Sequence, residues 1–187
     1  MLNLPNLITL FRILLVPLLV VILLTEVNGK DVLALAVFLL AALTDFLDGF
    51  VARRRRQITR LGKLLDPAAD KILTSAAFIS LVGLDRAPAW IVVVIVAREF
   101  AVSTLRSLAA AQNVVVAASF SGKLKTVTQI VAISLAIGAG LLGSWSWLHP
   151  LALWVALVAT VYSGVEYFVR LGRRVLLEPP GGEPGAA

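Results

Sequence analysis

The chain contains no cysteine, and this absence excludes disulfide bonds, thiol nucleophiles and cysteine-bound metals. It also lacks a glycine-rich loop followed by Lys-Ser or Lys-Thr, so a P-loop phosphate site is excluded. Charged residues make up only 15% of the 187 residues, whereas a soluble domain is normally about a quarter charged. A separate soluble domain is therefore not expected.

Apolar residues dominate instead, at 59% of the chain. A transmembrane helix needs about 20 mostly apolar residues, and backbone groups in lipid must be satisfied within the helix itself. Six stretches approach that length: 7–25, 32–50, 68–84, 89–110, 125–143 and 148–170. We therefore predict an all-α polytopic membrane bundle of about six transmembrane helices. It forms one domain over residues 1–175, and a disordered Pro/Gly tail follows over 176–187.

Positive charge falls almost entirely on one side of this threading. The opposite side holds only Lys30 and Arg86. The first side holds Arg12, the cluster within 53–63, Lys71, Arg98, Arg106, Lys123, Lys125, Arg170, Arg173 and Arg174. By the positive-inside rule that side is cytoplasmic, so both termini are expected in the cytoplasm. The net charge of +6 then indicates contact with anionic membrane lipid, and no nucleic-acid partner is expected.

Four aspartates lie at the ends of the second and third apolar stretches: Asp45, Asp48, Asp66 and Asp70. A charge in or near hydrocarbon is costly, so an acid there is a functional hypothesis. Crowded carboxylates repel one another unless they share a cation, and oxygen ligands suit Mg²⁺ or Mn²⁺. We therefore predict that two helix ends present the four acids to one divalent metal site. Its position is the cytoplasmic boundary of the membrane.

The spacing of these acids supports a common pocket. At roughly 100° per helical residue, the first pair shares about one third of the helix circumference with Gly49 and Ala52. Residues this small leave room for a ligand. The second pair is four residues apart and shares one face of its helix. Helix caps or surface pairs with nearby arginines explain one or two such acids, but not four.

The complete pattern is Asp45-x2-Asp48-Gly49-x2-Ala52-Arg53-x8-Gly62-x3-Asp66-x3-Asp70. At every defining position it resembles the signature of the CDP-alcohol phosphatidyltransferase family. The resemblance implies a CDP-linked lipid donor, whose pyrophosphate bridges two Mg²⁺ or Mn²⁺ ions held by the four aspartates. It also implies that Gly49 and Ala52 lie against the cytidine and that Arg53 lies near the phosphates. Asp70 is implied to act as the general base on the acceptor hydroxyl; the resulting oxygen attacks the lipid-bearing phosphorus, and CMP leaves.

The first residues of the chain fit a role in binding the donor. Asn6, Thr9 and Arg12 recur at every third position and form a polar stripe on a helix. Members of the family commonly begin with a Pro-Asn…Thr…Arg pattern of this kind. A helix cap followed by an ordinary snorkelling arginine is the alternative interpretation.

Cations outside the signature indicate the acceptor. Arg98 and Arg106 lie about two turns apart on the fourth stretch, and Glu99 neutralises only part of their charge. Lys123 and Lys125 follow in the next cytoplasmic segment. A phosphate-bearing acceptor would supply the missing anion, so we predict that these four cations bind its phosphate. Cations that only snorkel and fix the topology are the alternative.

Most of residues 1–130 resemble one branch of the family, the bacterial phosphatidylglycerophosphate synthases. This likeness implies CDP-diacylglycerol as donor, glycerol 3-phosphate as acceptor, a homodimer, and the bacterial cytoplasmic (inner) membrane as location. Sibling enzymes remain open: cardiolipin synthase of the same fold, or an inositol-phosphate or serine phosphatidyltransferase. A divalent-cation transporter would need polar residues through the membrane, whereas 32–43 and 72–84 are apolar. His-dependent phosphotransfer lacks a nucleophile, because the only histidine, His149, falls on the opposite side from the acids.

Overall fold

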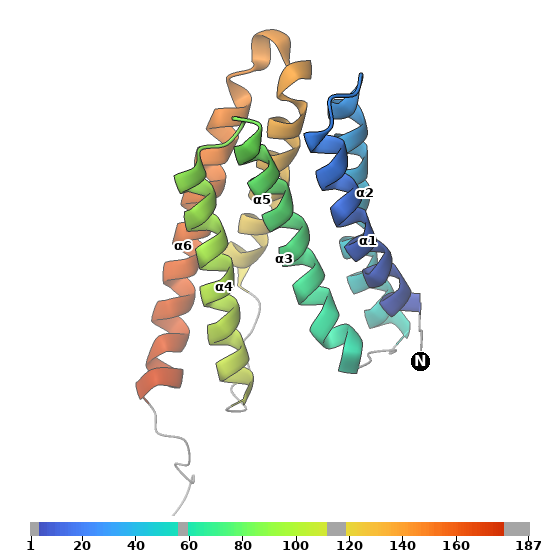
Figure 1. The fold of residues 1–187 in the computed structure, drawn as a ribbon. Coiled ribbons are helices and arrows are strands. Elements are labelled where there is room, and N and C mark those ends of the chain that lie inside the picture. The colour runs from blue at the N-terminus through green and yellow to red at the C-terminus, as the bar shows by residue number, and fades with distance from the viewer. Residues whose placement is uncertain (1–3, 56–59, 112–118, 178–187) are drawn as a thin grey trace, which may run out of the picture.

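The computed structural model describes the backbone of residues 4–55, 60–111 and 119–177, and side chains within 7–44, 68–111 and 119–170. The described chain forms α1 (Leu4–Leu24), α2 (Lys30–Arg55), α3 (Arg60–Gly83), α4 (Ala89–Ala111), α5 (Phe120–Ile137) and α6 (Leu148–Leu177). Two 3₁₀ turns, η1 (Gly138–Leu141) and η2 (Gly143–Trp145), connect α5 to α6. These ranges contain no strand, so the all-α prediction is confirmed (Figure 1). The predicted tail falls mostly on 178–187, outside the described residues.

Each predicted apolar stretch corresponds to one helix, but the helices of the signature are longer than predicted. The second helix continues to Arg55 and the third begins at Arg60, eight residues before its apolar stretch. Hydropathy marks only the apolar part of a helix, whereas backbone hydrogen bonds continue through charged residues. The four aspartates therefore lie inside helices.

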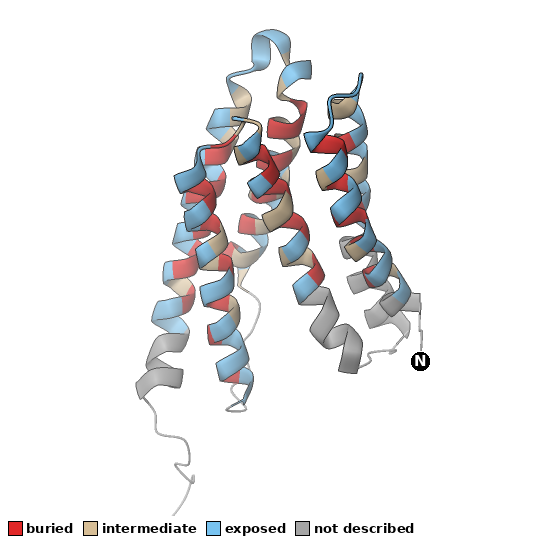
Figure 2. Cartoon of the chain, in the orientation of Figure 1, coloured by how far each residue is buried: buried red, intermediate tan, exposed pale blue. Residues whose placement is uncertain are grey.

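The outward faces of the bundle are as apolar as its core. On α1, exposed Leu14 and Leu18 alternate with buried Leu15 and Leu19, and Figure 2 shows buried stripes facing inward along the helices. A helix that is apolar on all sides is typical of a membrane span, because a soluble bundle has a polar outer face. Three described segments are long and apolar enough to cross a membrane: Leu7–Leu24, Phe120–Leu141 and Gly143–Arg170. The chain thus has the character of an integral membrane protein.

The helices form two groups of three. In the first half of the bundle, α1 packs extensively against α2 and α3; in the second half, α6 packs against α4 and α5. Contacts between the two halves are fewer and run mainly through α2, α3, α4 and α5. The helices α3 and α4 meet at the upper end of the bundle and diverge toward its lower end (Figure 1). Both α1 and α6 have their outer termini at the lower end.

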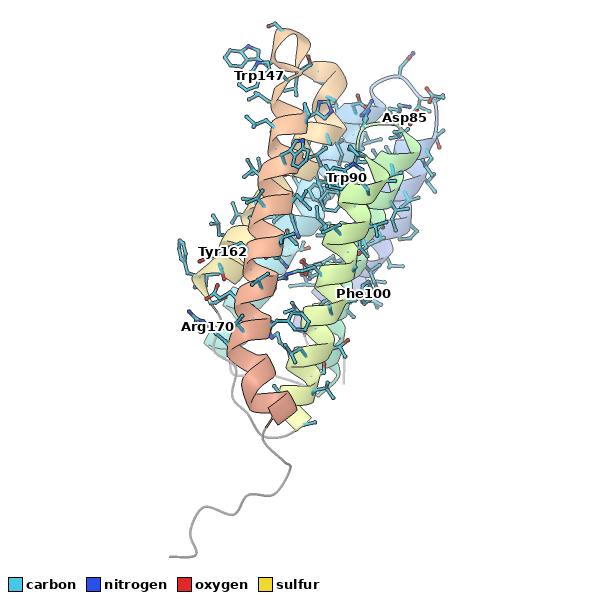
Figure 3. The ribbon with its side chains drawn as sticks, turned by 90° about the vertical axis from the view of Figure 1, so that its left-hand side faces the viewer. Asp85, Trp90, Phe100, Trp147, Tyr162 and Arg170 are labelled. Carbon is cyan, nitrogen blue, oxygen red and sulfur yellow. The ribbon has the colours of Figure 1, made fainter. Side chains whose placement is uncertain are left out.

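All four tryptophans of the chain belong to the upper end. Trp90 begins α4 and packs edge-on against Trp154 of α6, with ring centroids 5.4 Å apart. Trp145 and Trp147 stack in the connection that precedes α6. Figure 3 shows Trp147 and Trp90 at the upper end and Arg170 toward the lower end. Exposed tryptophans typically mark a membrane–water interface, so the upper end carries one of the two belts expected for a spanning protein.

A tight turn between α3 and α4 presents Arg86 to the upper end. Asp85 has φ of 55°, and the backbone N–H of Arg86 donates to the carbonyl of Leu81 at 2.9 Å. This six-residue closure is a Schellman cap, whose left-handed position is usually glycine and sometimes a short polar residue. The cap reverses the chain directly at the end of α3.

Arg86 links the two halves of the bundle through an ion pair with Asp31 and a hydrogen bond to Ile137, and these contacts are called the clasp. Its Nη1 and Nη2 donate to the two carboxylate oxygens of Asp31 at 2.9 and 3.0 Å, and Nη1 also donates to the carbonyl of Ile137 at 2.6 Å. A Cβ at position 140 would lie 2.9 Å from Asp31 Oδ2, so Gly140 allows η1 to approach the ion pair. The first turn of α2, the α3–α4 turn and the end of α5 are thereby joined.

Removing this clasp is expected to destabilise the fold. Arg86→Gln loses hydrogen bonds to a largely shielded carboxylate, and bonds of this kind contribute about 1.5–3 kcal/mol. At roughly 2–4 °C per kcal/mol, the apparent Tm in detergent falls by about 3–12 °C. The matched control is Lys30→Gln, because Lys30 pairs at 2.7 Å with Glu26, whose side chain is 87% exposed. Equal shifts for the two variants in a fluorescence melting experiment would contradict the clasp.

Candidate active site

The four aspartates occupy equivalent levels on two antiparallel helices. Asp45 lies ten residues before the end of α2, and Asp70 lies ten residues after the start of α3. At 1.5 Å per residue, both lie about 15 Å from the lower helix ends, and Asp48 and Asp66 lie about 10 Å from them. Both helices pack against α1. The fold thus places each aspartate of α2 at about the same height in the bundle as one aspartate of α3.

The prediction that the acids lie at helix ends is corrected by this arrangement. They lie about two to three turns inside α2 and α3, because both helices continue beyond the apolar stretches. Several predicted site side chains fall outside the described part of the chain: Asn6, Asp45, Asp48, Gly49, Ala52, Arg53 and Asp66. Among the side chains that are described, no three His, Cys, Asp or Glu residues gather as a metal site.

Asp70, the predicted general base, connects the two halves of the bundle. Its side chain is half-buried, and its backbone carbonyl accepts a hydrogen bond from Thr74 Oγ1 at 3.0 Å. The Asp70 carboxylate is close enough to interact electrostatically with the ammonium of Lys125, because α3 packs against α5. The predicted base and one predicted acceptor cation therefore face the same region.

Two of the predicted donor-binding residues point into the bundle. Thr9 and Arg12 are both 0% exposed, although each lies on the highly apolar α1. Arg12 Nε donates to Thr44 Oγ1 at 3.4 Å, and Thr44 directly precedes Asp45 on α2. Arg12 is therefore no snorkelling cation; it lies at the level of the first pair of acids.

Glu99 is the centre of a buried polar cluster in the second half. It is 8% exposed, and Lys125 Nζ lies 2.6 Å from each of its carboxylate oxygens. Arg98 Nη1 donates to Glu99 Oε1 at 3.2 Å, while Arg98 Nη2 donates to Ser163 Oγ on α6 at 2.7 Å. Two of the four predicted acceptor cations are thus brought together around one carboxylate.

Gln129 extends this cluster and was not predicted from the sequence. Its Nε2 donates to Glu99 Oε1 at 3.2 Å and to Thr160 Oγ1 on α6 at 3.0 Å. A signal was present, because Ser121, Lys125 and Gln129 recur every fourth residue in an apolar helix and so share one face. Such a polar stripe in a membrane span usually faces the interior of the protein.

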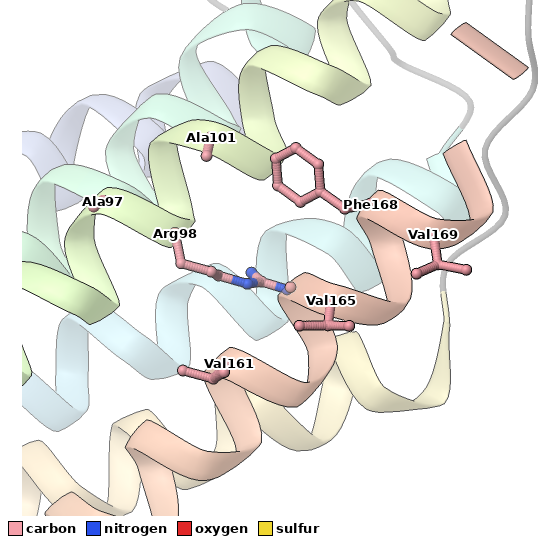
Figure 4. A pocket seen from close by; sticks show the side chains of 8 residues that line it. Ala97, Arg98, Ala101, Val161, Val165, Phe168 and Val169 are labelled. Atoms are coloured by element: carbon pink, nitrogen blue, oxygen red, sulfur yellow. The ribbon is translucent and has the colours of Figure 1, made fainter. Parts of the chain in front are cut away.

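The side chain of Arg98 reaches Ser163 by passing between α4 and α6. A Cβ at Gly164 would lie 3.0 Å from Arg98 Cγ and 3.2 Å from Nε, so the glycine makes this passage possible. Figure 4 shows Arg98 in an apolar groove of about 560 Å³, beside Ala97 and Ala101 of α4 and Phe168 of α6.

The other two predicted acceptor cations, Arg106 and Lys123, are exposed on α4 and α5. The start of α5 is fixed by Ser119, whose Oγ accepts a hydrogen bond from the N–H of Gly122 at 3.1 Å. Ser121 Oγ donates to the carboxylate of Glu166 on α6. In Figure 1 the start of α5 lies well above the lower end of α4. The helix that carries Arg106 therefore extends further toward the lower end of the bundle than the helix that carries Lys123.

Comparison with known proteins gives one consistent result. A model of the CDP-alcohol phosphatidyltransferase family matches residues 2–162. A CDP-diacylglycerol–glycerol-3-phosphate 3-phosphatidyltransferase of Bacillus subtilis is 48% identical, covering 90% of this chain and 94% of its own. The enzyme of the same name from Rickettsia typhi is 38% identical, covering 89% and 95% of the two chains. A probable phosphatidylglycerophosphate synthase of Mycobacterium tuberculosis is also 38% identical, covering 92% and 83%.

The family match spans most of the chain, from α1 into α6, and includes every position of the aspartate signature. The chain belongs to the CDP-alcohol phosphatidyltransferase family.

Proposed function

We propose that the protein transfers the phosphatidyl group of CDP-diacylglycerol to glycerol 3-phosphate, releasing CMP and forming phosphatidylglycerophosphate. The observation that carries this proposal is the likeness, over about nine tenths of the chain, to relatives named for that reaction. The buried cations of the second half support a phosphate-bearing acceptor, since serine would not require them.

The four aspartates are proposed to hold two Mg²⁺ or Mn²⁺ ions. Their chemistry fits, because all four are hard oxygen ligands and their backbone positions share one level of α2 and α3. Such ions, when bound, neutralise a pyrophosphate and stabilise the entering and leaving oxygens. Thr9 and Arg12 are buried on α1, which packs against both helices that carry the acids, and a hydroxyl and a guanidinium are suited to the donor's phosphates.

Asp70 is proposed to take the proton of the acceptor hydroxyl. It faces α5, which carries Lys123 and Lys125, so an acceptor held there by its phosphate lies within the region that Asp70 adjoins. The deprotonated oxygen forms a bond to the lipid-bearing phosphorus, the phosphoanhydride bond breaks, and CMP leaves. Gly49 and Ala52 give the cytidine room, and Arg53 neutralises phosphate charge.

The lower end of the bundle is proposed to face the cytoplasm, with six spans and both termini inside. At the opposite end, the cations Lys30 and Arg86 are each paired with an acid, Glu26 or Asp31, so they contribute little net charge. The remaining basic residues belong to the lower part, as the positive-inside rule requires. We place the protein in the bacterial inner membrane as a homodimer, by analogy with the family.

Purified protein with CDP-diacylglycerol and Mg²⁺ should release CMP when glycerol 3-phosphate is added. Plain glycerol and serine should support at most a few per cent of that rate, because neither carries the phosphate that the cations of the second half are proposed to bind. Product identity is checked by mass spectrometry of the lipid. Equal rates with glycerol or serine would contradict the proposed acceptor, and preference for inositol phosphate or phosphatidylglycerol would assign a sibling reaction.

Arg106→Ala should mainly raise the KM for glycerol 3-phosphate. Loss of one charge-assisted hydrogen bond of about 1.5–3 kcal/mol corresponds to roughly ten- to a hundredfold weaker binding. The KM for the donor should change less than about threefold, since the donor's phosphates are assigned to the first half. Arg170→Ala is the control, because Arg170 is also an exposed arginine and pairs with Glu166 at 2.8 Å. An unchanged acceptor KM in Arg106→Ala would remove Arg106 from the phosphate site.

A further inference from the structure

We propose that Glu99 is a positioning residue of the acceptor site, which fixes Lys125 and Arg98 for the acceptor's phosphate. The inference rests on the proposed function, because it concerns the same acceptor. Glu99 lies on α4, Lys125 on α5, and Arg98 is anchored to α6 through Ser163. One carboxylate therefore sets the relative positions of two cations, one from α4 and one from α5, while α6 holds Arg98 through Ser163.

The hydrogen bonds of Glu99 exclude a role for it as a free base. Its Oε1 accepts from Lys125, Arg98 and Gln129, and its Oε2 accepts from Lys125. An ionised carboxylate has about four acceptor positions, so this one is saturated. Gln129 is in turn held by Thr160. The Glu99 carboxylate is thus held in one position by hydrogen bonds from α4 and α5, and it fixes the positions of Lys125 and Arg98 in turn.

Among Arg98, Glu99 and Lys125 the cations outnumber the carboxylates by one, and Asp70 is the other acid whose charge acts on Lys125. Arg98 and Lys125 contribute two positive charges, and Glu99 contributes one negative charge, in a site where all three side chains are about nine tenths shielded. Arg98 uses Nη1 and Nη2, and its buried Nε has no hydrogen-bond partner among the described side chains and backbone. An oriented pair of cations with excess charge and unused donors is suited to a phosphate group.

Without Glu99 the two cations would repel each other and lose their common anchor. Their separation and orientation would then vary, and a phosphate would have to restore both on binding. The cost therefore falls on acceptor binding and not on the donor or on the bond-breaking step. A carboxylate that merely competed with phosphate for the cations would have the opposite effect, because its removal would strengthen acceptor binding.

Steady-state kinetics of Glu99→Gln in the full-length protein test this inference. We expect the KM for glycerol 3-phosphate to rise about tenfold or more, with kcat and the donor KM within about threefold. Glu99→Asp retains the charge and should give an intermediate acceptor KM. Glu166→Gln is the matched control: Glu166 also accepts a hydrogen bond from α5, through Ser121, but touches neither buried cation. An unchanged or lowered acceptor KM in Glu99→Gln, or equal loss of all three parameters, would overturn the inference.

Two further measurements keep the test decisive. If Glu99→Gln does not fold, Gln129→Met removes one neutral hydrogen bond and should raise the acceptor KM about three- to tenfold; no rise would overturn the inference. Inorganic phosphate provides a readout without turnover: it should raise the Tm of the unmodified protein, and at least tenfold more phosphate should be needed in Glu99→Gln. Absence of turnover with glycerol 3-phosphate would refute the proposed function alone, whereas equal phosphate responses would refute the role of Glu99.

Discussion

Charge in a hydrocarbon-facing bundle must be compensated, and this constraint governs every polar feature of the protein. At the upper end, Arg86 and Asp31 compensate each other and close the bundle. In the second half, Glu99 pairs with both Arg98 and Lys125, and their remaining positive charge is proposed to meet the phosphate of the acceptor. In the first half, the signature brings four aspartates to similar heights on α2 and α3, and metal ions are proposed to offset the repulsion between such closely spaced carboxylates.

The division into two halves suits a reaction between two unlike substrates. The first half carries the acids and the buried donor-side residues Thr9 and Arg12, and the second half carries Arg98, Glu99 and Lys125. The Asp70 carboxylate and the Lys125 ammonium interact electrostatically across the boundary, which is where the proposed mechanism brings the acceptor hydroxyl to the donor phosphorus. The clasp at the upper end joins the halves on the side away from this boundary, so it sets their spacing without occupying the site.

The sequence predicted the helices well, because apolar stretches of about 20 residues leave few alternatives in a membrane protein. It did not predict that α2 and α3 continue about one to two turns past the apolar stretches, because hydropathy does not report backbone hydrogen bonding. It predicted a phosphate-binding role for Arg98 and Lys125 from their charge alone. Their common contact with Glu99 depends on how α4, α5 and α6 pack, which the charge pattern does not show. Gln129 and Gly164 are uncharged, so the charge pattern did not indicate them either. The signature acids Asp45, Asp48 and Asp66, by contrast, are known by their spacing and backbone position.

Direct binding of Mn²⁺ tests the central claim that the four signature aspartates of α2 and α3 share metal ions. Titration of the purified protein, followed by the electron paramagnetic resonance signal of free Mn²⁺, should show two ions bound per chain. Asp70→Asn should lose at least one of them, while Asp85→Asn, which changes an aspartate in the α3–α4 turn, should still bind two. Binding of no Mn²⁺ by the unmodified protein, or unchanged binding in Asp70→Asn, would contradict the account.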